Sequence, residues 1–223
     1  MDATEPSAST GDLIANSLRT DIMQGRLKSQ EPLRQDEIAA RFGVSKIPVR
    51  EALFQLKGEG LVIFFPNRGA EVSELSIAEA DEIYTLRIAL ETVALRRAIP
   101  HLTIANLNRA EKVLGTLDRG QNLAQWGKLN WEFHSILYYP ANLPRLMEWV
   151  RTLHVNSTRY VIIYLLASPD HRQVTQDEHR QILEACRHGD TKAATVCLEH
   201  HLQSTANHLV AFLKQRESQI SQT

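Results

Sequence analysis

The spacing of apolar residues between positions 36 and 57 predicts two short helices joined by a tight turn. Apolar positions 38, 39 and 42 share one face of the first helix, and positions 49, 53 and 56 share one face of the second. Gly43 lies where a helix commonly ends on a left-handed residue, and Ser45 can cap the helix that follows. The outer face of the second helix is polar and basic, with Lys46, Arg50, Gln55 and Lys57. This pattern is typical of a helix-turn-helix.

A β-prone run follows the second helix. Residues 61–65 read Leu-Val-Ile-Phe-Phe, residues 66–69 have the composition of a turn, and residues 70–72 can return as a partner strand. Arg68 lies at the tip of this wing. An amphipathic helix capped by Thr10 or Asp12 is expected ahead of the helix-turn-helix, with a loop over residues 26–35 between them. We therefore predict a winged helix-turn-helix domain over residues 10–74.

Only helical periods remain after the wing. The predicted helices span residues 76–99, 103–118, 123–137, 144–166, 171–187 and 190–215. Ser76 and Glu79 have the spacing of a capping box at the start of the first of them. We therefore expect a mostly α protein, in which an all-α antiparallel bundle of about six helices over residues 76–216 follows the winged domain.

Composition limits the possible functions. The 223 residues carry a net charge of −1, so contacts with nucleic acid must come from a local basic patch. No apolar run approaches the roughly 20 residues of a membrane span, and the polar N-terminus lacks the apolar core of a signal peptide. We expect a cytoplasmic protein with no membrane partner. Cys186 and Cys197 lack the CxxC spacing of a metal or redox site.

Three histidine-containing segments of the predicted bundle can form a shared polar site. Asn130 and His134 lie four residues apart, on one face of a helix. His179 follows Glu178 on the next-to-last helix, and His201 lies on the last. Imidazole nitrogens and an amide oxygen are suitable ligands for a divalent metal. A histidine taken alone is more often solvated or hydrogen-bonded than a ligand, so both interpretations stay open from the residues themselves.

Arg87 lies on a largely apolar face of the first bundle helix, where a cation is costly without a partner. Glu91, one turn further on, is one candidate partner. The carboxylate of a ligand is the other, because a planar guanidinium matches its geometry. Other aromatic residues and histidines are expected in the core or at structural and exposed positions; they are Trp126, Trp131, Phe133, Tyr138, Tyr160, His101, His154, His171, His188, His200 and His208.

The run VSKIPVREALFQLKGEGLV at residues 44–62, followed by PNRGAEV, resembles the winged-helix domain of GntR-type bacterial transcription regulators. The resemblance implies a double-stranded DNA operator as partner and DNA contacts from Ser45, Lys46, Ile47, Pro48, Arg50 and Arg68. Lys46 and Ile47 replace the usual Arg and Thr, and Asp36 stands where the family often has a DNA-contacting Arg. Base contacts are expected to differ, because lysine lacks the bidentate fork that arginine offers guanine.

The second half resembles the FCD effector domain of the FadR branch of that family. The shared motifs are R-x-x-x-E at residues 87–91, N-x-x-F-H at 130–134, E-H-x-x-I at 178–182 and H-L at 201–202. The resemblance implies that one divalent metal ion binds to Asn130, His134, His179 and His201. The three imidazoles favour zinc, and nickel or manganese suit the same nitrogen and oxygen ligands. The resemblance also implies that Arg87 binds a small carboxylate effector. Asn130 replaces a common Asp, which lowers the negative charge offered to the metal.

Three functions follow from these features. The first is a metabolite-responsive transcription regulator, a repressor, that binds a pseudo-palindromic operator as a homodimer. The second is a metal-dependent hydrolase, but the sequence lacks H-E-x-x-H and offers only Glu178 as a general base. The third is a DNA-binding protein whose bundle only dimerises. We expect the first, and therefore no enzyme.

Overall fold

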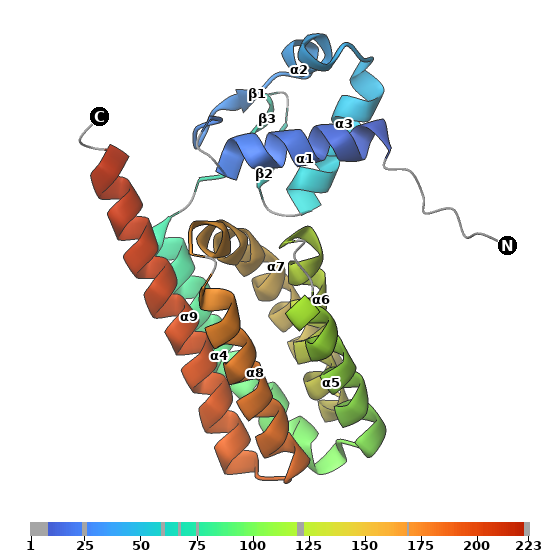
Figure 1. Ribbon diagram of the computed structural model, residues 1–223, viewed down its shortest axis with the longest axis vertical. Coiled ribbons are helices and arrows are strands. Elements are labelled where there is room, and N and C mark those ends of the chain that lie inside the picture. The colour runs from blue at the N-terminus through green and yellow to red at the C-terminus, as the bar shows by residue number, and fades with distance from the viewer. Residues whose placement is uncertain are drawn as a thin grey trace, which may run out of the picture. The chain divides into compact units, whose positions relative to one another are not determined.

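The computed structural model describes residues 9–23, 26–58, 61–66, 68–74, 76–119, 123–168 and 170–220. The chain divides between residues 75 and 76 into two compact units, which are traced in Figure 1. Helices dominate both units, and the strands belong to the N-terminal one. The mostly α fold with a small antiparallel sheet is confirmed. None of the described helices is long and apolar enough to cross a membrane.

The N-terminal unit is a winged helix-turn-helix. Its helices are α1 (Thr10–Met23), α2 (Gln35–Phe42) and α3 (Lys46–Gly58), and its strands are β1 (Pro32–Leu33), β2 (Val62–Phe65) and β3 (Gly69–Val72). Helices α1 and α2 contact α3, which buries Val49, Leu53 and Leu56 completely. Gly43 adopts the left-handed conformation, with φ 65° and ψ 34°, and ends α2 as predicted.

The sheet contains a strand that the sequence did not predict. Strands β2 and β3 pair antiparallel, with Phe64 opposite Ala70. Strand β1 lies inside the segment that was expected to be a loop, and it pairs with the other edge of β3, where Pro32 faces Glu71. Two residues are too few to show an alternating pattern, and the edge position tolerates proline.

Two helix starts differ in detail from the prediction. Ser9, and neither Thr10 nor Asp12, caps α1: the Asp12 N–H donates to Ser9 Oγ at 3.1 Å, while the Ser9 N–H donates to the Asp12 carboxylate at 3.0 Å. At the start of the bundle, the Glu79 N–H donates to Ser76 Oγ at 3.3 Å. The Glu79 carboxylate accepts from Arg159 and Tyr160 of a distant helix.

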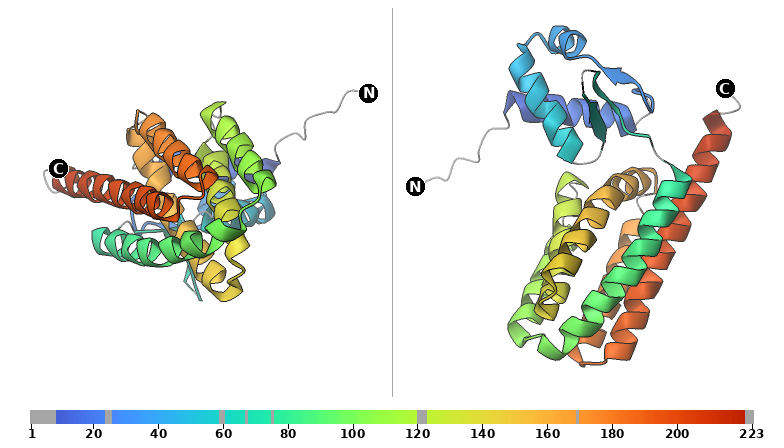
Figure 2. Two further views of the ribbon diagram at one scale, coloured as in Figure 1. Left: turned by 90° about the horizontal axis from the view of Figure 1, so that it is seen from below. Right: turned by 180° about the vertical axis from the view of Figure 1, so that it is seen from behind.

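The C-terminal unit is a helical bundle. Its described helices are α4 (Ile77–Ala98), α5 (Ile104–Arg119), α6 (Leu123–Tyr138), α7 (Pro144–Ala167), α8 (His171–Arg187) and α9 (Thr191–Ile220), with the 3-10 turns η1 (Ile99–His101) and η2 (Tyr139–Ala141). Helix α4 packs against α9 and α7, while α8 packs against α9 and α5 (Figure 2). The predicted bundle is confirmed, and α9 continues beyond its predicted end at residue 215.

Helices α6 and α7 approach closely at Gly127. A Cβ atom added there would lie 2.7 Å from Cγ2 of Thr158, a distance that non-bonded carbon atoms do not tolerate. The missing side chain at Gly127 therefore allows the close packing of α6 against α7.

We expect Gly127→Ala to destabilise the bundle by about 1–3 kcal/mol, because overpacking forces side chains or helices apart. The matched control is Gly115→Ala on α5, where the nearest atom to an added Cβ is the flexible end of Arg119, at 3.7 Å. That change should be neutral or stabilising by up to about 1 kcal/mol, since alanine favours helix. Urea unfolding midpoints measure both, and equal midpoints for the two variants would contradict this explanation.

Candidate functional site

Three histidines from three helices meet inside the bundle. His134 of α6, His179 of α8 and His201 of α9 each place a ring nitrogen within 4.8 Å of the other two. Their ring centroids are 4.6 to 5.4 Å apart, and their exposed fractions are 0, 0 and 4%. The structure thus brings together all three histidines that the sequence singled out.

The imidazole of His134 is oriented by a tyrosine. Its Nδ1 lies 3.0 Å from the Tyr138 hydroxyl group. That hydroxyl group donates its only hydrogen to Glu91 Oε2, at 2.8 Å. The His134 Nδ1 must therefore carry the hydrogen in this contact, and Nε2 is left with a free lone pair.

The other two imidazoles also carry their hydrogen on Nδ1. His201 Nδ1 lies 2.8 Å from Glu178 Oε2, and an ionised carboxylate can only accept. His179 Nδ1 lies 2.9 Å from Gln176 Oε1, and the Gln176 amide is itself fixed because its nitrogen donates to Asp118 at 3.1 Å. All three Nδ1 atoms therefore donate outward, and all three Nε2 atoms keep lone pairs for a ligand.

Burial keeps the imidazoles of His134 and His179 neutral. It is the largest cause that holds the pKa values of His134 and His179 well below the ordinary 6.5. The neighbouring imidazoles and Arg87 act in the same direction. Neutral imidazole is the form that binds a metal ion, so His134 and His179 need not lose protons near neutral pH before they bind one.

Asn130 supplies a further donor atom. It lies on α6 one turn before His134 and is 6% exposed. Its Oδ1 is buried without a hydrogen-bond partner among the described residues, and so are Nε2 of His134 and Nε2 of His179. Buried polar atoms normally have partners. These orphaned atoms fit a divalent cation, because imidazole nitrogen and amide oxygen suit zinc, nickel and manganese.

Arg87 has three polar partners inside the protein. Its Nε donates to Glu91 Oε1 at 2.6 Å, its Nη1 donates to Ser157 Oγ at 3.1 Å, and its Nη2 lies 3.4 Å from His154 Nδ1. Of the two partners that the sequence left open, the structure shows Glu91. Since Glu91 also accepts from Tyr138, one carboxylate connects Arg87 to the tyrosine that orients His134.

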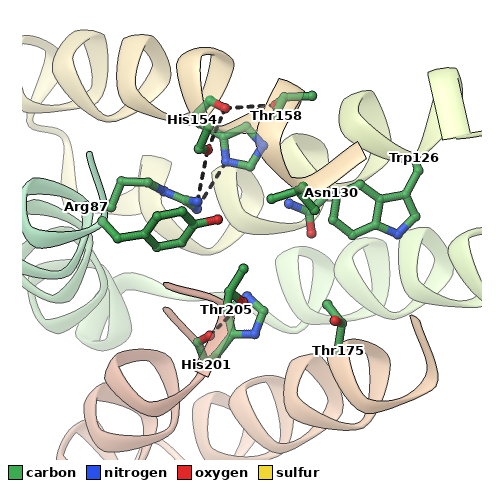
Figure 3. Close-up of a pocket in the computed structure, with 11 residues that line it drawn as sticks. Arg87, Trp126, Asn130, His154, Thr158, Thr175, His201 and Thr205 are labelled. Atoms are coloured by element: carbon green, nitrogen blue, oxygen red, sulfur yellow. Dashed lines mark hydrogen bonds between the residues drawn. The ribbon is translucent and has the colours of Figure 1, made fainter. Parts of the chain in front are cut away.

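A cavity lies beside the histidine cluster, and Asn130, His201 and Arg87 all line it (Figure 3). Its wall contains Tyr84, Arg87, Trp126, Asn130, His154, Ser157, Thr158, Val161, Thr175, His201 and Thr205. The centre of a water-sized molecule can occupy about 20 Å³ of it, which is room for one or two waters. A ligand of more than a few atoms would therefore require side chains or helices to move.

Two residues of this wall had a different predicted role. Trp126 was expected in the core; it is 6% exposed, yet it also lines the cavity. His154 was expected to be structural or exposed; it is buried beside Arg87 and also lines the cavity. Its signal was its spacing, since positions 150, 154, 157 and 161 follow the buried stripe of α7. His200, by contrast, is exposed as expected.

The residues predicted to contact DNA surround the start of α3. Ser45, Lys46, Ile47 and Arg50 are exposed, Pro48 is half-buried, and Arg68 is exposed in the turn between β2 and β3. Lys46 Nζ lies 2.6 Å from Asp36 Oδ1; an exposed ion pair of this kind is weak and can be exchanged for a phosphate contact. The Arg50 guanidinium group lies 5.5 Å from the ring centroid of Phe54, which stacks on Phe64 at 4.9 Å.

The buried imidazoles predict a bundle that is sensitive to acid. Burial lowers the pKa of His134, His154 and His179 in the folded state. The unfolded chain therefore binds more protons once the pH falls below about 6.5, and stability falls with it. We expect the urea unfolding midpoint of the metal-free protein to decrease from about pH 7 to pH 5. His200→Gln, at an exposed position, should keep this slope, and a midpoint that is constant over this range would contradict the prediction.

Comparisons with known proteins identify both domains. Residues 10–72 match the model of the bacterial regulatory proteins of the gntR family, and residues 82–204 match the FCD domain. The HTH-type transcriptional regulator YdhC of Bacillus subtilis (strain 168) is 30% identical over 90% of this chain and 91% of its own. The HTH-type transcriptional repressor RspR of Escherichia coli (strain K12) is 28% identical over 89% of this chain and 88% of its own.

A solved structure has the same organisation. The crystal structure of a GntR family transcriptional regulator from Pseudomonas syringae pv. tomato str. DC3000 is 33% identical, covers 96% of this chain and 90% of its own, and has a TM-score of 0.58. These relatives are regulators and not enzymes. The alternative of a hydrolase gains no support, because the Glu178 carboxylate is engaged with His201. The chain belongs to the GntR family of DNA-binding transcriptional regulators and carries the family's FCD domain.

Proposed function

We propose that this protein is a metabolite-responsive repressor whose helical domain binds a divalent metal and, with it, a small organic acid. One observation carries the proposal: His134, His179 and His201 place ring nitrogens within 4.8 Å of one another. Nε2 of His134, Nε2 of His179 and Oδ1 of Asn130 are buried without a partner among the described residues. Arg87 lines the same cavity as Asn130 and His201. A bundle that only dimerised would have no reason to keep these polar atoms buried and without partners.

His134, His179, His201 and Asn130 would hold the ion. Three imidazoles suit zinc, and nickel or manganese share the same nitrogen and oxygen donors. When bound, the ion supplies positive charge that attracts a carboxylate to its open coordination positions. Tyr138, Gln176 and Glu178 contribute by fixing each imidazole in the tautomer that leaves Nε2 free.

Arg87 would bind the effector's carboxylate or a hydroxyl group. A guanidinium group has five N–H bonds, and contacts to Glu91, Ser157 and His154 use three of them. The two that remain belong to a side chain that is 3% exposed and already held in place. A ligand would therefore meet a donor that loses little conformational freedom on binding.

The N-terminal domain, residues 10–74, would bind the operator, and the helical domain, residues 76–216, would bind the effector and form a homodimer. Two copies related by a twofold axis read a pseudo-palindromic site twice as long as one copy reads. Repression, and a location in the cytoplasm with the chromosome, are supported by the similarity to a named repressor.

We expect His179→Ala to lose the metal, to lower the melting temperature and to blunt the response to an effector. The cause is the loss of one of three imidazole ligands. His200→Ala is the matched control, because His200 lies beside a proposed ligand but is exposed. Elemental analysis of protein prepared without chelator, and after loading with zinc, nickel or manganese, measures the metal. A wild-type protein that retains none of these ions would refute the metal site.

We expect Arg50→Ala to abolish binding to an operator selected from random DNA duplexes. Arg50 is exposed on the second turn of α3, the helix proposed to enter the major groove. Lys112→Ala, which removes an exposed charge from α5, should leave DNA binding unchanged. Gel-shift titration measures the affinity, and circular dichroism checks the fold. An Arg50→Ala variant that binds as well as the wild type would show that this arginine does not contact the operator.

A further inference from the structure

Tyr84 carries a hydroxyl group that packing does not explain. The residue lies on α4 one turn before Arg87, lines the cavity and is 2% exposed. Its ring is held by the Arg87 guanidinium group, 4.9 Å from the ring centroid. Ser157 and Arg87 lie close enough to its oxygen to lower its pKa as hydrogen-bond donors. Neither contact has the geometry of a hydrogen bond, and the hydroxyl hydrogen has no acceptor among the described residues. A phenylalanine would fill the same space without burying an orphaned polar group.

The Tyr84 hydroxyl group is available as a donor. Burial is the main cause that raises its pKa above the ordinary 10.0, so it stays protonated at neutral pH. The nearby polar groups already pair with each other, since Arg87 donates to Ser157. A ligand oxygen in the cavity is the partner that this hydroxyl group lacks.

The serine and threonine hydroxyl groups of the cavity wall differ from that of Tyr84, because their hydrogens are already used. Ser157 and Thr158 both donate to the carbonyl oxygen of His154, at 2.9 and 2.8 Å. Thr175 donates to the carbonyl of His171 and Thr205 to that of His201, each at 2.9 Å. Since each hydrogen is used within its own helix, these oxygens can only accept from a ligand. A ligand that satisfies them must bring hydrogen-bond donors of its own.

The charges of the cavity limit which donors can enter. Its described wall contains Arg87 and no aspartate or glutamate. An ammonium group would therefore meet a like charge without a counter-charge on the wall, and burying it would be costly. Neutral hydroxyl groups carry no such penalty.

We infer that the effector is a short hydroxycarboxylate and that Tyr84 is the residue that selects it. The inference rests on the proposed function, which places the carboxylate at the metal and Arg87. The Tyr84 O–H donates to an oxygen of the ligand, and the ligand's hydroxyl groups donate to the threonine oxygens of the wall. An unsubstituted acid of the same length leaves those oxygens without donors, and an amino acid brings a charge that the wall does not balance.

The test uses the metal-loaded full chain and acids matched in carbon number. Glycolate, glycerate, threonate and gluconate are compared with acetate, propionate, butyrate and hexanoate by thermal shift and calorimetry. We expect a hydroxylated acid to bind about tenfold more tightly than its unsubstituted counterpart, the usual effect of one or two added hydrogen bonds. Tyr84→Phe should reduce this preference several-fold while the melting temperature of the ligand-free protein stays the same or rises.

Further variants distinguish recognition of the ligand's hydroxyl groups from a general effect of losing a buried hydroxyl group. Tyr164→Phe removes another buried hydroxyl group that has no partner among the described residues, but Tyr164 is not part of the described cavity wall, so the preference should not change. Thr205→Val should weaken binding of the hydroxylated acid, whereas Thr152→Val should not. Thr152 is exposed on α7 and donates to the Glu148 carbonyl at 3.0 Å in the same way.

The outcomes distinguish this inference from the proposed function. Unsubstituted acids that bind as tightly as hydroxylated ones, or a Tyr84→Phe variant with unchanged preference, would overturn the inference and leave an acid-binding regulator in place. Serine binding more tightly than glycerate would show that the ligand carries an ammonium group. A protein that holds metal but binds no acid of either series would overturn the proposed function itself.

Discussion

A single buried carboxylate holds the polar interior of the bundle together. Glu91 is completely buried, and its two oxygens accept from Arg87 and from Tyr138. The first contact balances the charge of a buried guanidinium group. The second uses the only hydrogen of the Tyr138 hydroxyl group, so His134 Nδ1 must donate to the Tyr138 oxygen and carries the hydrogen of the ring. Removing one partner of a buried ion pair typically costs about 3–5 kcal/mol. The charge balance of Arg87 and the orientation of the His134 ring therefore depend on the same side chain.

The interior of the bundle contains polar and charged side chains where most proteins have an apolar core. Histidines from four helices, with Arg87 and Glu91, occupy positions that aliphatic side chains could fill. Nδ1 of each clustered histidine pairs with a neighbouring side chain, whereas Nε2 of His134 and Nε2 of His179 are buried without a partner among the described residues. The cost of burying these two atoms is recovered only if a ligand pairs with them. This arrangement favours binding, since the ligand restores the hydrogen bonds or coordination that folding removed.

The local features of the fold could be read from the sequence, because helix periods, the turn at Gly43 and the wing depend on neighbouring residues. Strand β1 could not, since two residues carry no period. Asn130 and His134 share a face by spacing alone, but their meeting with His179 and His201 depends on how the helices pack, and only the family resemblance implied it. The unpaired hydroxyl group of Tyr84 could not be predicted from the sequence either, because the lack of a partner depends on the three-dimensional surroundings.

Helix α7 connects the cavity with the start of the bundle. His154, Ser157 and Thr158 line the cavity. Two residues further on, the Tyr160 hydroxyl group donates to Glu79 and lies 3.3 Å from both the backbone nitrogen and the carbonyl oxygen of Ser76. Ser76 is the residue at which the chain enters the helical unit. Because close-packed helices shift as rigid elements, a ligand that displaced this part of α7 would also act on Ser76, and so on the segment that leads covalently to the DNA-binding unit.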